Sequence, residues 1–519
     1  MMVSLPTIAD LNLFPVVPAM IVAVGMCLLL LIDLWIPEDE KNRTAWLAQG
    51  ILVTAFVVNL FTFNAPNSES LLGMFMADRF TAFFNALALV AAFIGIFLSV
   101  DYLKRTGMER GEYYSLILFS ASGAMFMAAA NDLVTIFVAL ELLSIPLYVL
   151  SAFRYSTADN PEDEAAERKS EEAGMKYFIL GAFSSAFFVY GAALVYGGAG
   201  TTNLSEIFVV ATELAQDPTL TIGSPLLMLL GAGLILVALG FKIAVFPFHM
   251  WTPDVYEGAP TSVTAYMSVA AKIGGVAALA RILAFGLPVL YVTDGATTAA
   301  WQLSVGLVAV LTMILGNLTA ITQNNMKRML AYSSIAHGGY LLMAVTAAGT
   351  LGITAQQVLT AIGIYLIGYM FTNMGAFAVL MAIEKNNGTG TEIDDFAGLF
   401  NTQPMLSILM ALFMLSLVGI PATGGFIGKY YVFALAMQAE LYTLAVIGIL
   451  TSVASAYYYM RPVVKMFLDD EAEGDPGAGA ATYLRWAIYI SAAGVLLIGL
   501  APGLATSLLD VASVASAGF

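Results

Sequence analysis

Long apolar runs recur along the whole chain of 519 residues and decide its fold class. A helix needs about 20 apolar residues to cross the hydrocarbon core of a bilayer, whereas barrel strands would be about ten residues long with alternating polarity. The sequence follows the first pattern, so it predicts an all-α integral membrane protein with about 14 transmembrane helices. The runs lie near residues 14–36, 45–63, 78–100, 112–130, 132–153, 174–197, 224–248, 261–285, 300–321, 328–348, 354–382, 403–435, 440–464 and 482–507.

The composition excludes several classes of function. The chain is 60% hydrophobic and 11% charged, whereas soluble domains carry about 25% charged residues, so a soluble enzyme and a disordered chain are both excluded. The formal net charge of −16 argues against a nucleic-acid partner. One cysteine, Cys27, and two histidines, His249 and His337, are too few for an internal disulfide, a zinc site or a bis-histidine haem. We therefore expect no metal or redox cofactor in this chain.

Lysine and arginine residues concentrate in alternate connections between the expected helices. Basic residues mark the cytoplasmic side of membrane proteins. This distribution places the odd-numbered connections in the cytoplasm and both termini on the outer, periplasmic side of a bacterial inner (plasma) membrane. The odd-numbered connections and their flanks hold Lys41, Arg43, Lys104, Arg105, Arg110, Arg154, Arg168, Lys169, Lys327, Arg328, Lys385, Arg461, Lys465 and Arg485.

Two of the expected cytoplasmic connections are strongly acidic, at residues 154–173 and 469–475. Charge runs of this kind are usually solvated, so we expect loops there, with a docking surface as the alternative. Lys176 follows the first connection, at the cytoplasmic end of the run 174–197. Its long side chain can reach the interface from that position, so we expect an anchoring role, with proton entry as the alternative.

A few ionisable residues fall deep inside the apolar runs: Glu141, Lys242, Lys272 and Lys429, with His337 as a further polar member. A charge at the centre of a bilayer costs about 2.5–3.5 kcal/mol on insertion scales. Such residues are expected to face the interior of the protein and to mark an ion or proton route. His337 is as compatible with a packed core histidine as with a proton relay.

Two of the runs with a lysine also contain glycine and proline residues that interrupt helices. Gly240 and Pro247 flank Lys242 in the run 224–248, and residues 419–425 precede Lys429 in the run 403–435. Such breaks expose backbone groups at membrane depth and are tolerated only where protein or water satisfies them. Broken helices at corresponding positions of two halves are typical of transporters built from inverted repeats.

The positions of these breaks predict two inverted five-helix repeats. The fourth to eighth expected helices (residues 112–285) form the first repeat, and the ninth to thirteenth (residues 300–464) form the second. The broken seventh and twelfth helices then occupy the same place in each repeat. Residues 1–111 would supply three additional helices, and residues 465–519 a single C-terminal helix.

Lysine suits a proton relay. Low dielectric disfavours a charged amine, and a nearby carboxylate favours it, so a change in the distance between Glu141 and Lys242 would move a proton on or off the lysine. Arginine is too basic for this chemistry. A static ion pair is the competing interpretation, but it leaves Lys272 and Lys429 without an acidic partner.

Four motifs resemble the N-type antiporter-like membrane subunits of respiratory complex I, the NuoN or NdhB family. They are FPFHMWTPDVYEGAP at 246–260, KRMLAYSSIAHGGY at 327–340, ELLSIPLYVL at 141–150 and MKYFILGAF at 175–183. A lysine at position 429 agrees with the N-type, since the M-type subunit usually has glutamate there. The resemblance covers roughly the second to fourteenth expected helices. One departure is Ala271, where the family often has proline before its central lysine.

The resemblance implies a proton-translocating subunit of an NADH-, ferredoxin- or NADPH:quinone oxidoreductase. The family's glutamate–lysine pair maps to Glu141 and Lys242, its central lysine to Lys272 and its exit-side lysine to Lys429. NADH, FMN, iron–sulfur clusters and quinone are then expected on other subunits. The expected partners are an M-type antiporter-like subunit and small K- and J-type subunits in the lipid bilayer. The membrane would be a thylakoid in a photosynthetic lineage.

Two alternatives remain open. A subunit of a multi-subunit Na⁺/H⁺ antiporter shares the fold family, although the N-type motifs argue against it. A non-transporting scaffold subunit would keep the fold but would not need the buried lysines for proton pumping.

Overall fold

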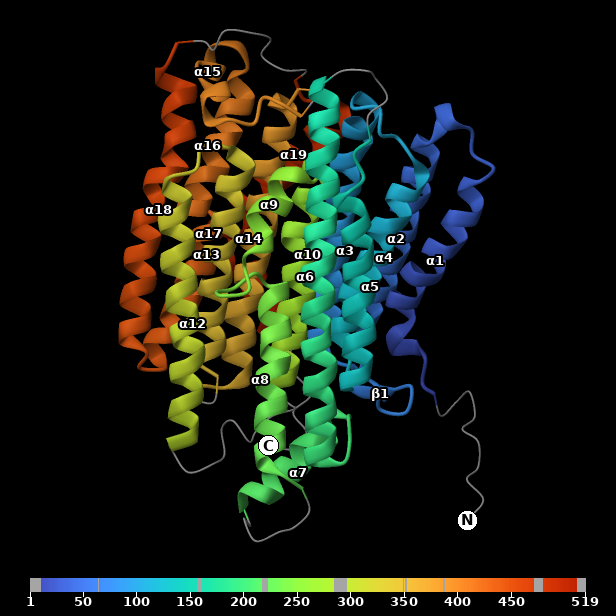
Figure 1. The fold of residues 1–519 in the computed structure, drawn as a ribbon, viewed down its shortest axis with the longest axis vertical. Coiled ribbons are helices and arrows are strands. Elements are labelled where there is room, and N and C mark those ends of the chain that lie inside the picture. Colours follow the sequence, from blue (N-terminus) through green and yellow to red (C-terminus); the bar gives the residue numbers. More distant parts are fainter. Residues whose placement is uncertain are drawn as a thin grey trace.

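Helices make up nearly all of the described chain, and most of them run along one direction as a single bundle (Figure 1). The computed structural model describes residues 11–510 except 64, 156–160, 217–222, 284–295, 349, 351, 386–387 and 471–478. The α-helices are α1 (Val17–Asp33), α2 (Asn42–Thr62), α3 (Arg79–Arg105), α4 (Gly111–Ala129), α5 (Leu133–Ser151), α6 (Pro161–Ala199), α7 (Leu204–Gln216), α8 (Pro225–Lys242), α9 (Trp251–Gly258), α10 (Thr261–Arg281), α12 (Ala296–Ile321), α13 (Met326–Thr346), α14 (Ala355–Ile383), α15 (Leu399–Thr402), α16 (Pro404–Val418), α17 (Gly424–Gln438), α18 (Tyr442–Leu468), α19 (Thr482–Leu500) and α20 (Pro502–Asp510).

Short elements complete the described chain. Three 3₁₀-helices are η1 (Phe14–Val16), η2 (Glu38–Glu40) and η4 (Ile393–Phe396). An antiparallel pair of three-residue strands, β1 (Ser68–Ser70) and β2 (Phe75–Ala77), pairs Glu69 with Met76. Figure 1 shows β1 and α7 at one end of the bundle and α15 at the other.

The prediction of an all-helical membrane protein is confirmed. Each of the 14 expected runs contains a helix or a pair of helices. Within the described ranges, 11 helices are long and apolar enough to cross a membrane. The other three expected runs contain α4, α13 and the pair α16 and α17, whose length or polarity keeps them outside that set.

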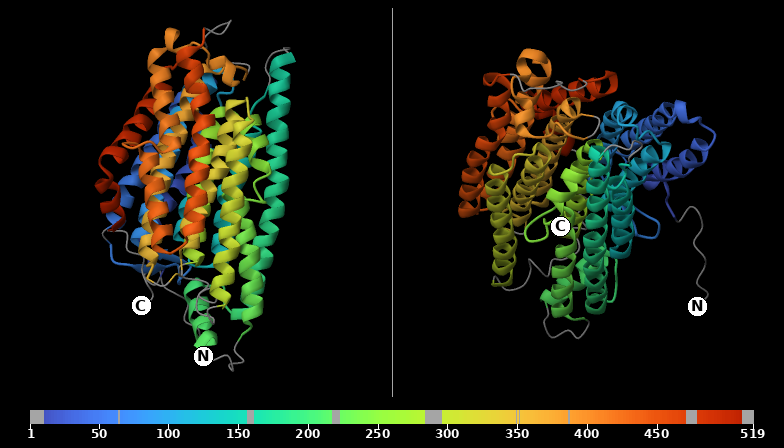
Figure 2. Two further views of the ribbon diagram at one scale, coloured as in Figure 1. Left: turned by 90° about the vertical axis from the view of Figure 1, so that its left-hand side faces the viewer. Right: turned by 45° about the horizontal axis from the view of Figure 1, so that its top comes forward.

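The core of the bundle lies along α10 and α14. The most apolar stretch of α10 is wholly buried and that of α14 is 94% buried, against 28% for α6 and 33% for α12. Figure 2 shows α6 at the outer edge of the bundle, in agreement with its exposure. Polar side chains on α10 and α14 are therefore shielded by surrounding helices on every side.

Both expected breaks are present. Helix α8 ends at Lys242, and Ala244 in the following turn adopts a φ of +61°. Helix α16 ends at Val418, and Gly419 continues with a φ of +94°, in the left-handed region that glycine favours at helix C-termini. The lysines sit differently at the two breaks, because Lys242 precedes the first break whereas Lys429 lies in α17, after the second.

The expectation of a loop over 154–173 is wrong for residues 161–173, which form the first turns of α6. This segment is rich in Glu, Ala, Lys and Arg, which favour helix. Pairs spaced four residues apart support it, with Arg168 to Glu164 at 3.4 Å. Asp159 and most of the second acidic segment lie outside the described residues.

Two ionisable residues near helix ends, Arg281 and Asp132, bind other parts of the bundle. Arg281 is 1% exposed and binds both carboxylate oxygens of Asp78, at 3.0 and 3.1 Å, which ties the end of α10 to the start of α3. Asp132 caps α5 by accepting hydrogen bonds from the backbone of Val134 and Thr135. Both residues hold helices together instead of contacting lipid.

Candidate functional site

Lys242 occupies a buried polar pocket at the end of α8. Its side chain is 3% exposed, and its Nζ donates hydrogen bonds to Ser144 Oγ at 2.7 Å and to Tyr177 Oη at 3.3 Å. The ring of Tyr148 faces the same ammonium at 5.7 Å. Hydroxyl oxygens and aromatic faces can stabilise a buried ammonium but can also accommodate the neutral amine.

Glu141 makes no direct ion pair with Lys242 among the described residues. Instead, Ser185 on α6 donates a hydrogen bond to Glu141 Oε1. Ser144, which binds Lys242, lies three residues after Glu141 and therefore on the same face of α5. Glu141 and Lys242 thus each bind a serine hydroxyl, Ser185 and Ser144 respectively, and not one another.

Lys272 links the middle of α10 to the first helix break. Its side chain is 2% exposed, and its Nζ donates to the main-chain oxygen of Ile243 at 3.4 Å. Ile243 directly follows Lys242, so Lys272 binds the backbone at the break that ends α8. The ring of Tyr369 on α14 lies 5.7 Å from the Lys272 Nζ.

Lys429 is bound by the second helix break. Its Nζ donates to the main-chain oxygens of Leu417 and Val418 at 2.8 and 2.9 Å, and to Ser452 Oγ at 2.8 Å. The ring of Tyr340 lies 5.2 Å from the same nitrogen. The end of α16 leaves these carbonyls without helical partners, and the lysine of the next helix satisfies them.

His337 lies between Lys272 and Lys429. Its Nδ1 is 2.5 Å from Tyr365 Oη, and its Nε2 is 3.3 Å from Tyr459 Oη. Because each ring nitrogen meets a hydroxyl that can donate or accept, both tautomers fit this site. This pairing favours the relay interpretation over a histidine in a purely apolar core.

Tyrosine rings fill the intervals on either side of His337. The ring of Tyr369, which contacts Lys272, is 4.9 Å from the His337 ring. The ring of Tyr340, which contacts Lys429, is 5.8 Å from it. Glu141, Lys242, Lys272, His337 and Lys429 thus follow one another across the bundle, and we call this succession the relay line.

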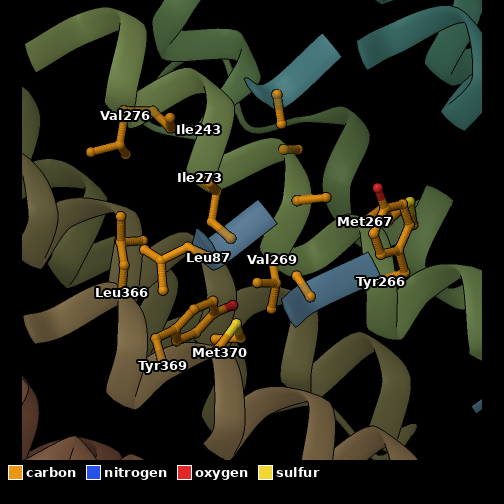
Figure 3. Close-up of a cluster of buried hydrophobic side chains, with 14 of the residues drawn as sticks. Leu87, Ile243, Tyr266, Met267, Val269, Ile273, Val276, Leu366, Tyr369 and Met370 are labelled. Atoms are coloured by element: carbon orange, nitrogen blue, oxygen red, sulfur yellow. The ribbon is translucent and has the colours of Figure 1, made fainter. Parts of the chain in front are cut away.

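Apolar side chains enclose the centre of the relay line. Figure 3 shows Ile243, Ile273 and Val276 grouped on one side, with Leu366 and Met370 near the Tyr369 ring. Ile273 is the residue after Lys272, and Val276 is one helical turn further along α10. The charged groups therefore lie in surroundings of low polarity, where an unpaired charge is costly.

Glycines allow the first break to fit between two helices. A Cβ at Gly275 on α10 would lie 2.9 Å from Ile243 Cγ2, and one at Gly338 on α13 would lie 3.0 Å from the Ile243 oxygen. Such separations are shorter than normal contacts, so any side chain at either position would displace the break. The close approach places the Ile243 carbonyl beside both Lys272 and His337.

Lys176 lies apart from the relay line. Its Nζ pairs with Asp254 Oδ2 at 2.6 Å and with Glu172 Oε1 at 2.5 Å. Arg328 bridges Asp254 at 2.8 Å and Glu257 at 3.1 Å. These residues, together with Lys169, form an ion cluster that ties α9 to α6 and α13.

Asp254 and Glu257 of the ion cluster lie on the short helix α9, which follows the first break. Burial alone would raise the pKa of Asp254. Hydrogen bonds from Lys176 and Arg328 outweigh that effect and hold the pKa of this carboxyl below its ordinary value. Asp254 is therefore ionised near neutral pH, which keeps the cluster intact.

Several site residues escaped the sequence analysis. Tyr365 and Tyr369 are spaced four residues apart in an apolar run, which was a usable signal for one polar face of a helix. The serines Ser144 and Ser452 gave no such signal, since a lone serine in a membrane helix usually bonds its own backbone. Within the described ranges, no group of three or more His, Cys, Asp or Glu side chains is placed to hold a metal ion.

Broken helices on either side of a line of buried lysines define a helical membrane protein of the antiporter-like class. The family model described as NADH:quinone oxidoreductase/Mrp antiporter, transmembrane, matches residues 130–455. The chain is 40% identical over 514 residues to NADH-quinone oxidoreductase subunit N of Chloroflexus aggregans, covering 99% of each chain. It is 42% identical over 500 residues to subunit N of Trichlorobacter lovleyi, covering 95% of each. The chain therefore belongs to the family of subunit N of NADH-quinone oxidoreductase.

Solved structures agree with this assignment. A chain of respiratory complex I from Thermus thermophilus superposes with a TM-score of 0.76 and is 32% identical, covering 96% of this chain and 100% of that one. A chain of the Mrp complex from Dietzia sp. gives a TM-score of 0.81 at 20% identity, covering 96% and 97%. At that identity, the second likeness shows a shared fold alone.

Proposed function

We propose that this chain is a membrane subunit of a complex I-type quinone oxidoreductase and that it moves protons along the relay line. The observation that carries the proposal is the binding of lysines by both helix breaks. Lys272 donates to the carbonyl oxygen freed after α8, and Lys429 donates to those freed at the end of α16. Breaks at membrane depth and buried lysines, each costly alone, stabilise one another here.

The chemistry of the relay is proton exchange between amines whose charges repel. A proton on Lys272 disfavours one on Lys242, because two like charges at close range in low dielectric are costly. Glu141 favours a proton on Lys242, and its hydrogen bond to Ser185 holds it near that lysine. A change in the charge or position of Glu141 would therefore pass a proton toward Lys272, then through His337 to Lys429.

A purely structural role for the lysines accounts less well for these contacts. Lys272 and Lys429 form no ion pair with a carboxylate in the part of the chain that the structure describes. Replacing buried charged groups by apolar residues of similar volume often stabilises a protein. The presence of two buried lysines that are bound by carbonyl groups is explained only if these lysines gain and lose a proton.

The proposed partners follow from the names of the relatives. Those relatives are subunits of NADH-quinone oxidoreductases, so we infer assembly with an M-type antiporter-like subunit and small K- and J-type subunits. NADH, FMN, the iron–sulfur clusters and quinone would bind elsewhere in that assembly. We also propose the inverted repeats 112–285 and 300–464, with the basic connections in the cytoplasm and both termini outside.

A subunit of a multi-subunit Na⁺/H⁺ antiporter is the second candidate, because the Mrp complex shares the fold. Identities of 40% or more to subunit N relatives favour the first. Purification separates the two candidates, since a complex I-type subunit co-purifies with an arm that contains iron–sulfur clusters, whereas an antiporter subunit does not.

The experiment that tests the relay measures proton pumping driven by quinone reduction in proteoliposomes that contain the assembled complex. Lys242→Ala and Glu141→Ala should each lower pumping while assembly stays normal. Lys104→Ala, which changes an exposed lysine at the end of α3, is the matched control and should pump like the wild type. Normal pumping by both site variants would show that the relay is assigned wrongly.

A further inference from the structure

We propose that Glu384 is a proton-loading site, which takes protons from the aqueous phase at one end of the bundle and delivers them to Lys272. This inference rests on the proposed function. Glu384 is the residue directly after α14 and is 1% exposed, although its neighbour Lys385 is exposed. It therefore lies just beneath the surface at the end of the bundle that carries the basic connections, which we call the basic end.

The carboxylate of Glu384 is only half satisfied. Its Oε1 accepts a hydrogen bond from the Tyr102 hydroxyl at 3.1 Å, whereas its buried Oε2 has no hydrogen-bond partner among the described residues. A buried acceptor without a partner is costly, and more so when it is charged. Such a group points to a bound water or to a proton on the carboxyl.

Basic groups lie in the region around Glu384, Tyr102 and Lys327. Lys327 on α13 is 5% exposed, donates to the Ala259 oxygen at 2.6 Å and lies within electrostatic reach of Glu384. Arg154 acts electrostatically on both Lys327 and Tyr102, and Glu257 and Lys169 of the ion cluster act on Lys327 from further away. The carboxylate can therefore persist in a buried position and accept a proton when one arrives.

A second unpartnered oxygen lies beside the same tyrosine. The backbone N–H of Thr261 donates to Tyr102 Oη at 3.3 Å, and the Thr261 Oγ1 is buried without a partner among the described residues. Thr261 is the first residue of α10, the helix that carries Lys272. The Tyr102 hydroxyl thus connects Glu384 to the start of that helix.

Polar residues continue along α10 toward Lys272. Thr261, Thr264, Ser268 and Lys272 are spaced three or four residues apart, so they form one stripe along the helix. The first and last are 11 residues apart, which is about 16 Å along the helix axis. All four are buried.

Helix α14 adds one polar side chain, Asn373, to this stripe. Asn373 lies three helical turns from Glu384 and one turn from Tyr369, whose ring contacts Lys272. Asn373 Nδ2 donates to Ser268 Oγ at 2.6 Å, while Asn373 Oδ1 is buried without a partner among the described residues. Asn373 thereby joins the stripe of α10, which forms a polar column from Tyr102, the hydrogen-bond partner of Glu384, to Lys272.

Water is the ligand that this column would bind. Buried waters typically make about three hydrogen bonds to polar groups that would otherwise lack partners. Three such groups lie along the column: Glu384 Oε2, Thr261 Oγ1 and Asn373 Oδ1. In the proposed step, a proton from bulk water adds to the Glu384 carboxylate. The resulting acid then releases that proton along the column to the neutral amine of Lys272, which becomes an ammonium as the carboxylate is restored.

The test compares Glu384→Gln with Asp394→Asn in assembled complex in proteoliposomes. Glutamine keeps an oxygen for the Tyr102 hydroxyl but cannot carry a proton. Asp394 lies in the connection after α14 with a side chain that is 84% exposed, so it is a matched control. We expect proton uptake coupled to quinone reduction to slow at least about tenfold in Glu384→Gln, since a positioned acid or base typically supplies about a hundredfold or more, and to remain normal in the control. Wild-type uptake in Glu384→Gln would overturn the loading site.

Two further measurements keep the test decisive. If Lys242→Ala stops pumping while Glu384→Gln does not, the loading site is wrong and the relay stands; if both pump normally, the proposed function itself is wrong.

Should Glu384→Gln fail to assemble, Glu384→Asp keeps a titratable acid one methylene shorter. The band of the protonated carboxylic acid in infrared difference spectra should then shift from its wild-type position. An unshifted spectrum would overturn the proposal.

Discussion

Lys272 donates a hydrogen bond from its Nζ to the main-chain oxygen of Ile243 at 3.4 Å, although the two residues lie 29 positions apart. Ile243 is the first residue after α8, so its carbonyl is available because the helix ends at Lys242. The break thereby supplies a backbone partner for Lys272 directly after the residue Lys242. A continuous helix would direct that carbonyl along its own axis and leave Lys272 in apolar surroundings.

Replacing Lys242 by arginine separates a relay from a structural ion site. Arginine keeps the positive charge and can bind Ser144, so a structural role would tolerate it. A guanidinium cannot release its proton in a protein, so we predict that Lys242→Arg lowers proton pumping as much as Lys242→Ala does. The measurement is pumping per NADH oxidised in proteoliposomes, and recovery of pumping in the arginine variant would contradict the relay.

A substitution without any titratable group should also interrupt the relay. A Cβ at Gly338 would lie 3.0 Å from the Ile243 oxygen and 3.3 Å from Val245 Cγ1, so Gly338→Val must displace the first break. We predict a loss of pumping in assembled complex, because the Ile243 carbonyl leaves Lys272. Gly233→Ala, which adds a methyl group with nothing within 4 Å on α8, is the control and should behave as the wild type. Equal pumping by the two variants would mean that the position of the break is unimportant.

The serines that bind the two lysines should differ in importance. Ser144→Ala removes the 2.7 Å bond of Lys242 and leaves it only the weaker contact with Tyr177, whereas Ser452→Ala leaves Lys429 two carbonyls. A hydrogen bond to a charged group contributes about 1.5–3 kcal/mol. We predict that Ser144→Ala slows proton-coupled turnover about tenfold or more, and Ser452→Ala by a smaller factor. Steady-state turnover of the two variants provides the comparison, and a reversed order would argue against it.

The ion cluster predicts a pH dependence in the stability of α9. The folded pKa of Asp254 lies below its ordinary value because Lys176 and Arg328 bind the carboxylate. Its stabilising effect is therefore present above the ordinary pKa of about 4 and is lost as the pH falls through the folded pKa. The pairs are partly exposed, so the effect is about 1 kcal/mol or less.

This pH dependence can be measured by amide hydrogen exchange of residues 251–258 in the purified complex. Asp254→Asn should exchange up to about fivefold faster than the wild type at neutral pH, which is 1 kcal/mol. The two proteins should converge below about pH 4. A difference between them that stays constant into acid would show that ionisation of Asp254 is not its cause.

The sequence predicted the features that follow from the free-energy cost of placing polar and charged groups in a membrane. Apolar runs of spanning length became helices, and each lysine placed at membrane depth lies inside the bundle, since hydrocarbon admits no unpaired charge. The broken helices were also predictable, because glycine and proline near Lys242 and Lys429 mark positions where a helix cannot continue. These signals are local and need no knowledge of which helices are neighbours.

Contacts between helices were not predictable in the same way. Glu141 binds Ser185 on α6, and Lys242 binds Ser144 on α5, so the expected direct pair is replaced by two bonds that depend on how α5, α6 and α8 pack. The polar column from Glu384 to Lys272 likewise depends on how α10 packs against α14. A single sequence shows the periodicity of the polar residues on one helix, but it does not show which helix packs against them.

Lys272 tests the central claim most directly, because it joins the relay line to the column from Glu384. Lys272→Met keeps the length of the side chain and removes its proton, so packing around α10 is preserved. The decisive measurement is proton translocation by the assembled variant complex in proteoliposomes during NADH-driven quinone reduction. The account predicts that translocation is lost, whereas translocation at the wild-type ratio of protons to electrons would contradict it.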